Sequence, residues 1–222
     1  MKKMNVILVL RTGGDFAFPD VHMISHHIKK QSEGVNLYCL TNLFEKEQVL
    51  KPCTVLPIPN SWAGWWSKMN LFSPELEKYR PFLFLDLDTA ILGDVRHFML
   101  SEDVEHSFVM LRDFYRLTQP ASGVMWIPAN NEKVPQIWNA WNRDPLDNMK
   151  KYRGDQEFIR SVTKPDLYWQ DIKKGIYTFK PTQKIWRQEL PEDVVLICFH
   201  GKPRIWDAIG KVKWVYNYVY DK

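Results

Sequence analysis

Two carboxylates spaced one residue apart follow a short apolar segment in the middle of the chain. The segment is 81–85, and the carboxylates are Asp86 and Asp88. The apolar run is too short to span a membrane and has no helical periodicity, so it predicts a buried central strand. Aspartates are costly to bury unpaired, and the carboxyl ends of strands in an open α/β sheet are where ligands bind. We expect both side chains to point to one side of an extended chain and to bind a divalent cation such as Mg²⁺ or Mn²⁺. The alternative is that both cap the strand by accepting hydrogen bonds from nearby backbone amides.

A second polar group ends another apolar segment near the C-terminus. His200 and Lys202 follow the predicted strand 194–199. The neutral imidazole of His200 could complete the metal site, and the Lys202 ammonium could contact a phosphate held by the same metal. A lone histidine at a strand end is more often structural. The aspartate pair elsewhere and the adjacent lysine favour the interpretation as a ligand.

An Asp-Gln pair follows a glycine at the start of a predicted helix. The residues are Gly154, Asp155 and Gln156. Asp155 could act only as the helix N-cap, which leaves Gln156 unexplained. At a catalytic site Asp155 could accept hydrogen bonds from sugar hydroxyls, and Gln156 could present its amide to a reacting centre.

Two glycine-containing segments are weaker candidates for ligand contact. The loop after the first predicted strand contains Thr12, Gly13 and Gly14, where the backbone could approach a ligand closely. It lacks the GxGxxG pattern, so a dinucleotide-binding fold is not indicated. A later loop, 120–122, ends in Ser122, and Gly123 begins the strand that follows. At both places an ordinary turn or tight packing is the competing explanation.

An aromatic segment precedes a candidate phosphate-binding lysine. Lys68 and, in the first loop, Arg11 could each contact a phosphate or a ribose, or could be solvated surface residues. Trp62, Trp65 and Trp66 could form a stacking platform for a donor or an acceptor. A hydrophobic cluster beneath a loop explains them equally well.

The composition fits a globular protein whose 222 residues, 1–222, we interpret as one domain. A net charge of +4 is too small to indicate nucleic-acid binding but suits an anionic substrate. The three cysteines form no CxxC pair (Cys39, Cys53 and Cys198), which predicts free thiols in a reducing compartment. The apolar run 6–10 is too short for a signal peptide, and no transmembrane segment is predicted. We therefore expect a cytoplasmic protein. The oligomeric state is left open.

Strands and helices alternate along the chain, which predicts an α/β fold with a mostly parallel central sheet flanked by helices. The expected strands are 5–10, 35–41, 53–56, 81–85, 108–111, 123–127, 175–180 and 194–199, and the expected helices are 20–31, 132–142 and one that begins at 155. In the C-terminal segment 211–220, bases alternate with aromatic residues. This alternation predicts an edge strand packed onto the domain. The same composition also suits peripheral contact with a membrane surface or a lipid-linked acceptor.

Taken in order, these motifs resemble glycosyltransferase family 8, the glycogenin-like retaining enzymes of the GT-A fold. The matching motifs are Lys68-Met69, 84–89, 122–126, Gly154-Asp155-Gln156 and 200–203. They span most of the chain, and their order is more specific than any one of them. The resemblance implies a single GT-A domain, a UDP-sugar donor, Mn²⁺ or Mg²⁺ as cofactor, and transfer to a hydroxyl of an acceptor such as a glycan with retention of configuration.

The resemblance also implies roles for individual residues. By this resemblance, the metal would be bound by Asp86, Asp88 and His200. The nucleotide sugar would be contacted by Thr12, Lys68, Ser122, Gly123 and Lys202. The residues beside the transferred sugar would be Asp155 and Gln156. The chain departs from the family in three places. The compact His-Gly-Lys-Pro replaces a longer gap, Ala-Ser stands where the family often has Asn before Ala-Gly-Val, and the first loop lacks the usual pattern.

Two other functions are compatible with parts of the sequence. The motif Asp86-Leu87-Asp88-Thr89 also matches phosphatases of the haloacid dehalogenase type, in which Asp86 would be the nucleophile. In that class the motif normally opens the domain, whereas here 85 residues precede it. The other alternative is a sugar- or nucleotide-binding module that keeps the fold without turnover.

Overall fold

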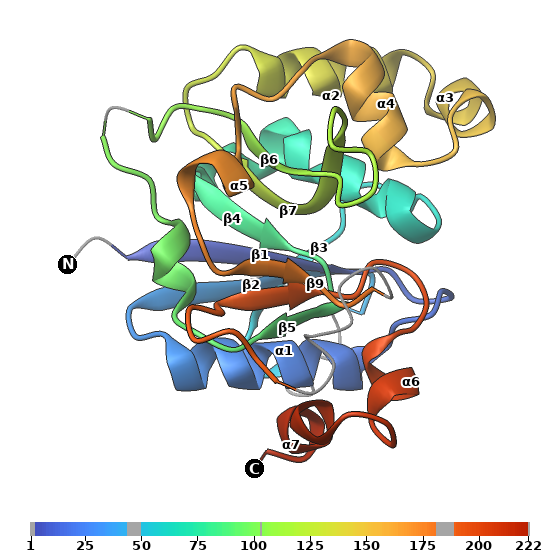
Figure 1. Ribbon diagram of the computed structural model, residues 1–222. Helices are drawn as coiled ribbons and strands as arrows, with labels where there is room; N and C mark the ends of the chain where they lie inside the picture. Colours follow the sequence, from blue (N-terminus) through green and yellow to red (C-terminus); the bar gives the residue numbers. More distant parts are fainter. Residues whose placement is uncertain (1–2, 44–49, 103, 181–188, 222) are drawn as a thin grey trace.

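A seven-stranded sheet forms the centre of the molecule, with strand order β3-β2-β1-β4-β7-β6-β8 (Figure 1). The computed structural model describes residues 3–43, 50–102, 104–180 and 189–221. The strands are β1 Met4–Leu10, β2 Val35–Thr41, β3 Thr54–Pro57, β4 Phe82–Leu85, β6 Val109–Arg112, β7 Pro120–Ile127 and β8 Leu167–Tyr168. Strand β7 runs antiparallel to β4 and β6, and the other four pairings are parallel. The predicted mostly parallel α/β sheet is confirmed.

A second, three-stranded sheet has the order β5-β10-β9. Its strands are β5 Thr89–Ile91, β9 Ile176–Thr178 and β10 Leu196–Cys198. Strand β10 pairs antiparallel with β5 and parallel with β9. Because β5 begins only four residues after the end of β4, the chain passes directly from the large sheet into the small one.

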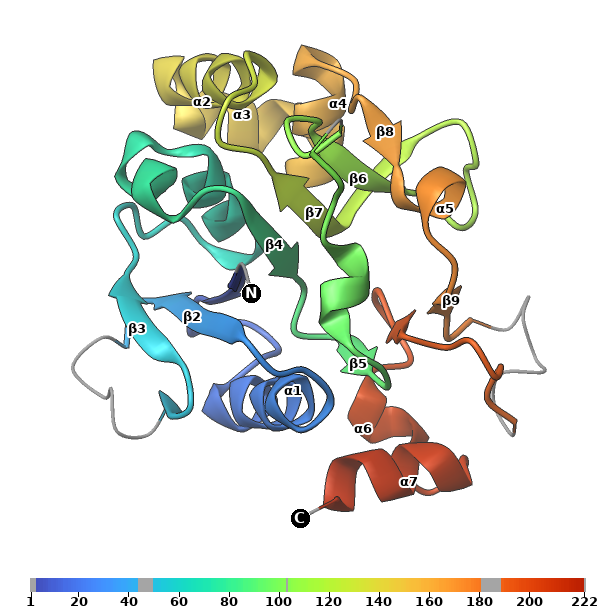
Figure 2. The same ribbon diagram turned by 90° about the vertical axis from the view of Figure 1, so that its left-hand side faces the viewer.

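Helices cover both faces of the large sheet (Figure 2). The α-helices are α1 Phe18–Gln31, α2 Lys133–Arg143, α3 Pro145–Lys151, α4 Asp155–Val162, α5 Trp169–Ile172, α6 Ile205–Ala208 and α7 Lys213–Tyr220, and the 3₁₀ helices are η2 Gly64–Phe72, η3 Pro74–Tyr79 and η4 Val95–Phe98. Helix α1 and the small sheet lie on one face, and η2, α2 and α4 lie on the other.

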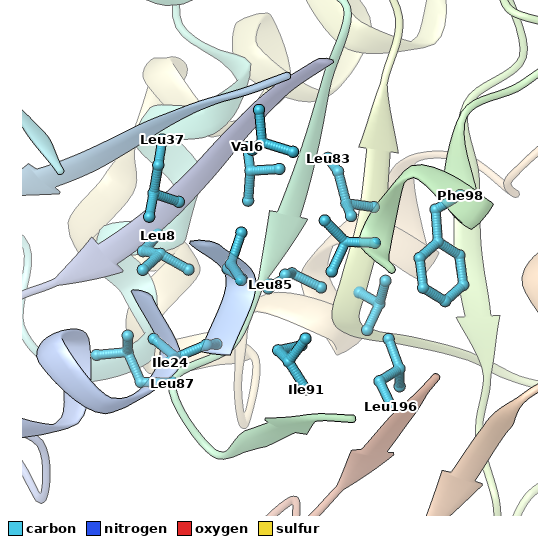
Figure 3. Close-up of a cluster of buried hydrophobic side chains, with 14 of the residues drawn as sticks. Val6, Leu8, Ile24, Leu37, Leu83, Leu85, Leu87, Ile91, Phe98 and Leu196 are labelled. Carbon is cyan, nitrogen blue, oxygen red and sulfur yellow. The ribbon is translucent and has the colours of Figure 1, made fainter. Parts of the chain in front are cut away.

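The alternation of side chains along the central strands builds two cores. In β4, Leu83 and Leu85 pack with Ile24 of α1 (Figure 3), whereas Phe82 and Phe84 pack on the opposite face with η2 and α2. Side chains alternate between the two faces of a strand, so a strand buried on both faces must be apolar throughout. The uninterrupted apolar run at 81–85 is explained in this way.

The C-terminal segment is a helix, so the predicted edge strand at 211–220 is wrong. In α7, Trp214, Val215 and Tyr218 are buried against Phe199 and its neighbours. Their i, i+1, i+4 spacing gives one apolar helical face, which the alternation of bases and aromatic residues obscured. The expectation that this segment packs onto the domain is confirmed.

All three cysteines are buried and free, as predicted. None of the helices in the described ranges has the length and apolar character needed to cross a membrane.

Candidate functional site

Asp86 and Asp88 lie in a turn between the two sheets. The Asp86 amide donates to the Gly123 carbonyl at 2.9 Å, which continues the pairing of β4 with β7, and the Thr89 amide donates to the Asp86 carbonyl at 3.2 Å. The expectation of an extended chain is therefore wrong at this point. The chain turns because Thr89 must begin β5 in the small sheet. The two carboxylates face different neighbours as a result.

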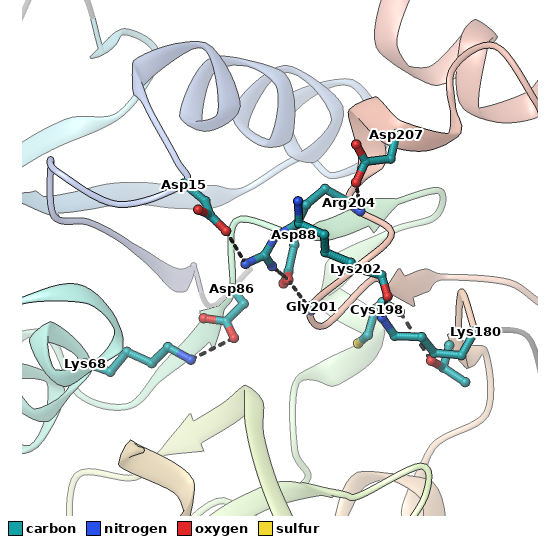
Figure 4. Close-up of polar contacts among 11 residues, drawn as sticks. Asp15, Lys68, Asp86, Asp88, Lys180, Cys198, Gly201, Lys202, Arg204 and Asp207 are labelled. Carbon is teal, nitrogen blue, oxygen red and sulfur yellow. Dashed lines mark hydrogen bonds and ion pairs between the residues drawn. The ribbon is translucent and has the colours of Figure 1, made fainter. Parts of the chain in front are cut away.

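Lys68 holds the first carboxylate (Figure 4). Its Nζ lies 2.8 Å from Asp86 Oδ2 and 3.6 Å from Asp155 Oδ2. Lys68 comes from η2, and Asp155 is the first residue of α4. A Cβ at Gly123 would lie 3.6 Å from Asp86 Oδ2, so this glycine of β7 stands directly beside the carboxylate. We call Lys68, Asp86 and Asp155 the lysine corner.

Burial and charge shift the proton affinities of the lysine corner. Burial raises the pKa of Asp86 to about 7, with further increases from the charges of Asp88 and Asp155, while the Lys68 ammonium opposes the shift. Burial alone would lower the pKa of Lys68, but the nearby Asp155 and Asp86 carboxylates outweigh it and raise this pKa. Two carboxylates thus contact one largely buried ammonium, and the charge of Asp88 acts on the same group.

Arg204 holds the second carboxylate. Its Nη1 donates to Asp88 Oδ2, and its Nη2 donates to Asp15 Oδ2 at 2.9 Å (Figure 4). The Gly201 amide also points at Asp88 Oδ2, at 3.4 Å. The guanidinium lies over the ring of Phe16, 4.7 Å from its centroid. We call Arg204, Asp88 and Asp15 the arginine corner; it joins the loop after β1 to the loop after β10.

Strand pairing brings His200 to the arginine corner. Cys198 is paired with Thr89, and the Phe199 amide donates to the Asp88 carbonyl at 2.9 Å, so His200 follows directly. Its Nε2 lies 2.5 Å from Thr178 Oγ1, and Phe114 stacks on its ring at 5.5 Å between centroids. Burial, and then the Lys180 ammonium, lower the pKa of His200 to about 4, so the imidazole is neutral at pH 7.

The remaining predicted residues lie around the same edge of the sheet. Ser122 is buried within β7, which begins at Pro120, so the loop expected at 120–122 is instead part of a strand. Gln156 follows Asp155 on α4 and is half-buried. Thr12 follows β1, and its hydroxyl accepts from Asn42 Nδ2 at 2.6 Å. The side chain of Lys202 is exposed, while its carbonyl accepts from Lys180 Nζ at 2.7 Å.

Sequence reasoning missed Arg204 and Asp15. Both had a local signal, because Arg204 stands two residues after Lys202 and Asp15 directly follows the glycine pair of the first loop. Thr178, which orients His200, gave no such signal, since only the pairing of β9 with β10 brings it there.

The candidate metal ligands are not assembled into a closed site. Within the described ranges, no group of three or more His, Cys, Asp or Glu side chains is arranged to hold a metal ion. Lys68 and Arg204 each contact Oδ2 of one carboxylate, which leaves Oδ1 of Asp86 and of Asp88 without a hydrogen bond in the described part of the chain. Carboxylate oxygens and a neutral imidazole are ligands that Mn²⁺ and Mg²⁺ accept. The donor chemistry fits such a cation.

The fold matches solved glycosyltransferases, although comparisons of the sequence alone find no match. A comparison with protein-family models gives no match, and a comparison with curated protein sequences gives none. The glycosyltransferase GlyE of Streptococcus pneumoniae TIGR4 superposes with a TM-score of 0.66 at 14% identity, covering 99% of this chain and 61% of GlyE. The chain thus spans about three fifths of the GlyE chain.

For two further solved structures, the superposition covers nearly the whole length of the matched chain. The galactosyltransferase LgtC, in complex with donor and acceptor sugar analogues, has a TM-score of 0.63 at 9% identity, with 97% of this chain and 94% of LgtC covered. Mouse xyloside xylosyltransferase 1 has a TM-score of 0.53 at 12% identity, with 91% and 98% covered. The chain therefore has the fold of the GT-A glycosyltransferases.

Proposed function

We propose that this protein is a metal-dependent glycosyltransferase that moves a sugar from a UDP-sugar to a hydroxyl acceptor with retention of configuration. One observation carries the proposal. On a GT-A sheet, the turn after central strand β4 gathers Asp86 and Asp88 together with Lys68, Asp155 and His200. These residues supply hard oxygen ligands, a neutral imidazole and buried positive charge at one edge, as a nucleotide diphosphate and its metal require.

Asp86, Asp88 and His200 would hold Mn²⁺ or Mg²⁺. His200 Nε2 is engaged by the Thr178 hydroxyl at 2.5 Å, so Nδ1 would be the ring nitrogen that binds the metal, in the tautomer whose Nε2–H donates to Thr178. When bound, the cation would neutralise charge on the departing diphosphate. Burial raises the pKa of Asp86, and the charges of Asp88 and Asp155 raise it further; these negative charges favour a cation at this place.

The basic residues divide between the two ends of the donor. Lys68, buried beside Asp86 and Asp155, would contact the donor near its sugar. Lys202 and Arg204, in the loop after β10, would offer their charges to the diphosphate. Thr12, Ser122 and Gly123 would contribute contacts to the nucleotide and the donor, since their segments meet at the same edge.

Retention is best explained by an acceptor hydroxyl that attacks the sugar from the same face that the diphosphate leaves. Asp86 and Asp88 would be committed to the metal, and Lys68 pairs with Asp155, so these described carboxylates leave no free pair for a double displacement. An acceptor hydroxyl would instead approach beside the diphosphate, which takes its proton. Asp155 and Gln156 would stabilise the oxocarbenium-like sugar by charge and hydrogen bonding.

The two alternatives receive less support. A phosphatase with its nucleophile at Asp86 is not favoured, because the matched folds are glycosyltransferases. A binding module without turnover would bind a nucleotide sugar but never release nucleotide.

Turnover of a donor panel separates these functions. The protein would be incubated with UDP-, GDP-, CDP- and TDP-sugars, with and without Mn²⁺, and released nucleoside diphosphate measured. We expect release from a UDP-sugar that needs Mn²⁺ and is lost in Asp155→Asn but not in Asp147→Asn, an exposed aspartate of α3. Release of phosphate from simple phosphate esters, without release from any nucleotide sugar, would contradict the proposal.

A further inference from the structure

Three tryptophans lie close together in the sequence, but only one of them is exposed. Trp62 and Trp66 both pack against Trp141, each at 5.1 Å between ring centroids, and Trp66 is only 8% exposed. Trp65 is 54% exposed, and among the described residues no aromatic ring contacts it. Trp62 and Trp66 are therefore packed against the core, and the exposure of Trp65 needs another explanation.

The geometry of η2 directs Trp65 toward the lysine corner. In a 3₁₀ helix, side chains three residues apart lie above one another on the same face. Trp65 and Lys68 have this spacing within Gly64–Phe72, and Lys68 points at Asp86 and Asp155. Trp66 and Met69 share the neighbouring face, which is buried in the core.

A contact with Gly154 fixes the place of the Trp65 ring. A Cβ at Gly154 would lie 3.3 Å from Trp65 Nε1, so the edge of the indole lies against the glycine backbone. Gly154 precedes Asp155, whose carboxylate lies 3.6 Å from Lys68 Nζ. The indole therefore stands one helical turn outside the Lys68–Asp155 pair and keeps an apolar face open to solvent.

We propose that Trp65 is the stacking platform for a pyranose ring of the acceptor, so that the acceptor is a glycan or glycoside. This inference rests on the proposed transferase function. The flat apolar face of an indole suits the C–H face of a sugar ring. The donor's diphosphate belongs at Asp86 and Asp88 and its sugar at Lys68 and Asp155, so a ring on Trp65 is the next group outward, where an acceptor must lie.

Variants of Trp65 test its role against a merely structural one. Trp65→Ala and Trp65→Phe are compared with Tyr216→Ala, whose ring is 53% exposed on α7 at the other end of the molecule (Figure 2). Gly154→Ala adds a methyl group at the indole edge and should displace the ring without removing it. Calorimetry with UDP and Mn²⁺ and the rate of donor hydrolysis report on the donor site alone.

We expect Trp65→Ala to raise the KM for a glycoside acceptor about tenfold while UDP binding and donor hydrolysis stay near wild type. Trp65→Phe and Gly154→Ala should lie between, and Tyr216→Ala should match wild type. Transfer unchanged in Trp65→Ala, or hydrolysis and transfer falling together, would overturn the inference.

A spectroscopic measurement tests the platform without turnover. The indole N–H signal of Trp65, assigned by its absence in Trp65→Phe, is followed by NMR during titration with methyl glycosides of glucose, galactose and mannose. A shift for at least one glycoside supports the platform even if donor turnover is absent, and no shift for any of them contradicts it. Failure of the proposed function would appear separately, as wild type that neither binds UDP with Mn²⁺ nor hydrolyses a donor.

Discussion

Asp86 and Asp88 are separated by one residue, yet the structure holds them in different ways. Asp86 is held by Lys68 on η2, which is packed into the core on the face opposite α1. Asp88 is held by Arg204 from the loop after β10, and the same guanidinium binds Asp15, whose side chain is 59% exposed. The lysine corner is therefore built into the folded domain. The arginine corner is a contact between two loops, in which Asp88 and Arg204 are largely buried and Asp15 is exposed.

This difference suggests a division of labour during binding. Lys68 cannot leave Asp86 and Asp155 without stranding two carboxylates, so it would stay in place when a donor binds. With the proposed donor bound, Arg204 would exchange Asp88 for the diphosphate, since both present anionic oxygens in a geometry that its planar fork accepts. The lysine corner would then be preformed, whereas the arginine corner would rearrange around the ligand.

The largest effect on stability is expected from Lys68→Met. Removing the ammonium leaves Asp86 and Asp155 without their shared partner, and breaking such a buried pair costs about 3–5 kcal/mol. Urea unfolding should show this loss, while Lys78→Met, at an exposed lysine of η3, should change little. A loss for Lys68→Met of less than about 1 kcal/mol would mean that the lysine corner is not part of the folded framework.

A smaller loss is expected from Arg204→Met. Asp88 keeps the Gly201 amide and the charge of Lys180, so the cost should be about 2 kcal/mol, as for a hydrogen bond to a charged group. Since the guanidinium no longer competes for Asp88, Mn²⁺ should raise the Tm of this variant more than that of wild type. The exposed Arg143→Met serves as control. An equal response to Mn²⁺ in Arg204→Met and wild type would show that Arg204 does not occupy the metal's place.

The pH dependence of stability should carry contributions of opposite sign from Asp86 in the lysine corner and from His200 beside the arginine corner. With the pKa of Asp86 raised to about 7, the folded protein keeps a proton that the unfolded chain releases above pH ~4. This contribution to stability is lost as pH rises from about 4 to about 7. With the pKa of His200 lowered to about 4, the unfolded chain takes up a proton first. That contribution is lost as pH falls from about 6.5 to about 4.

Thermal unfolding of two variants measures these slopes. The Tm difference between Asp86→Asn and wild type should increase as the pH rises from 4 to 7. The Tm difference between His200→Gln and wild type should increase as the pH falls from 6.5 to 4. Slopes of the same sign for both variants would contradict the opposite proton linkage of Asp86 and His200.

The sequence predicted what depends on local pattern. The run 81–85 was expected as a buried strand because its residues are apolar on both faces, and Asp155 was expected to begin a helix. The clustering of Asp86, Asp88, Lys68 and His200 was implied by the family resemblance, which depends on the order of the motifs rather than on any one of them. The chain turn after Asp86 was missed, because it depends on the pairing of β5 with β10 more than a hundred residues away.

Arg204 illustrates the same limit. A guanidinium in a loop has no periodicity that reveals its partner, and only the folded chain brings it to Asp88 and Asp15. The prediction for the C-terminal segment was wrong for a different reason, since its aromatic residues satisfy both a strand pattern and one face of a helix. Packing of Trp214 and Tyr218 against the small sheet decides between the two.

The central claim is tested most directly by calorimetric titration with UDP, in the presence and absence of Mn²⁺. The proteins compared are wild type, Asp88→Asn and the control Asp147→Asn. We predict that Mn²⁺ strengthens UDP binding to wild type and to Asp147→Asn by at least about tenfold, and that Asp88→Asn loses this gain. Equal affinity with and without Mn²⁺ in wild type, or an undiminished gain in Asp88→Asn, would contradict a metal-assisted UDP-sugar site at the end of β4.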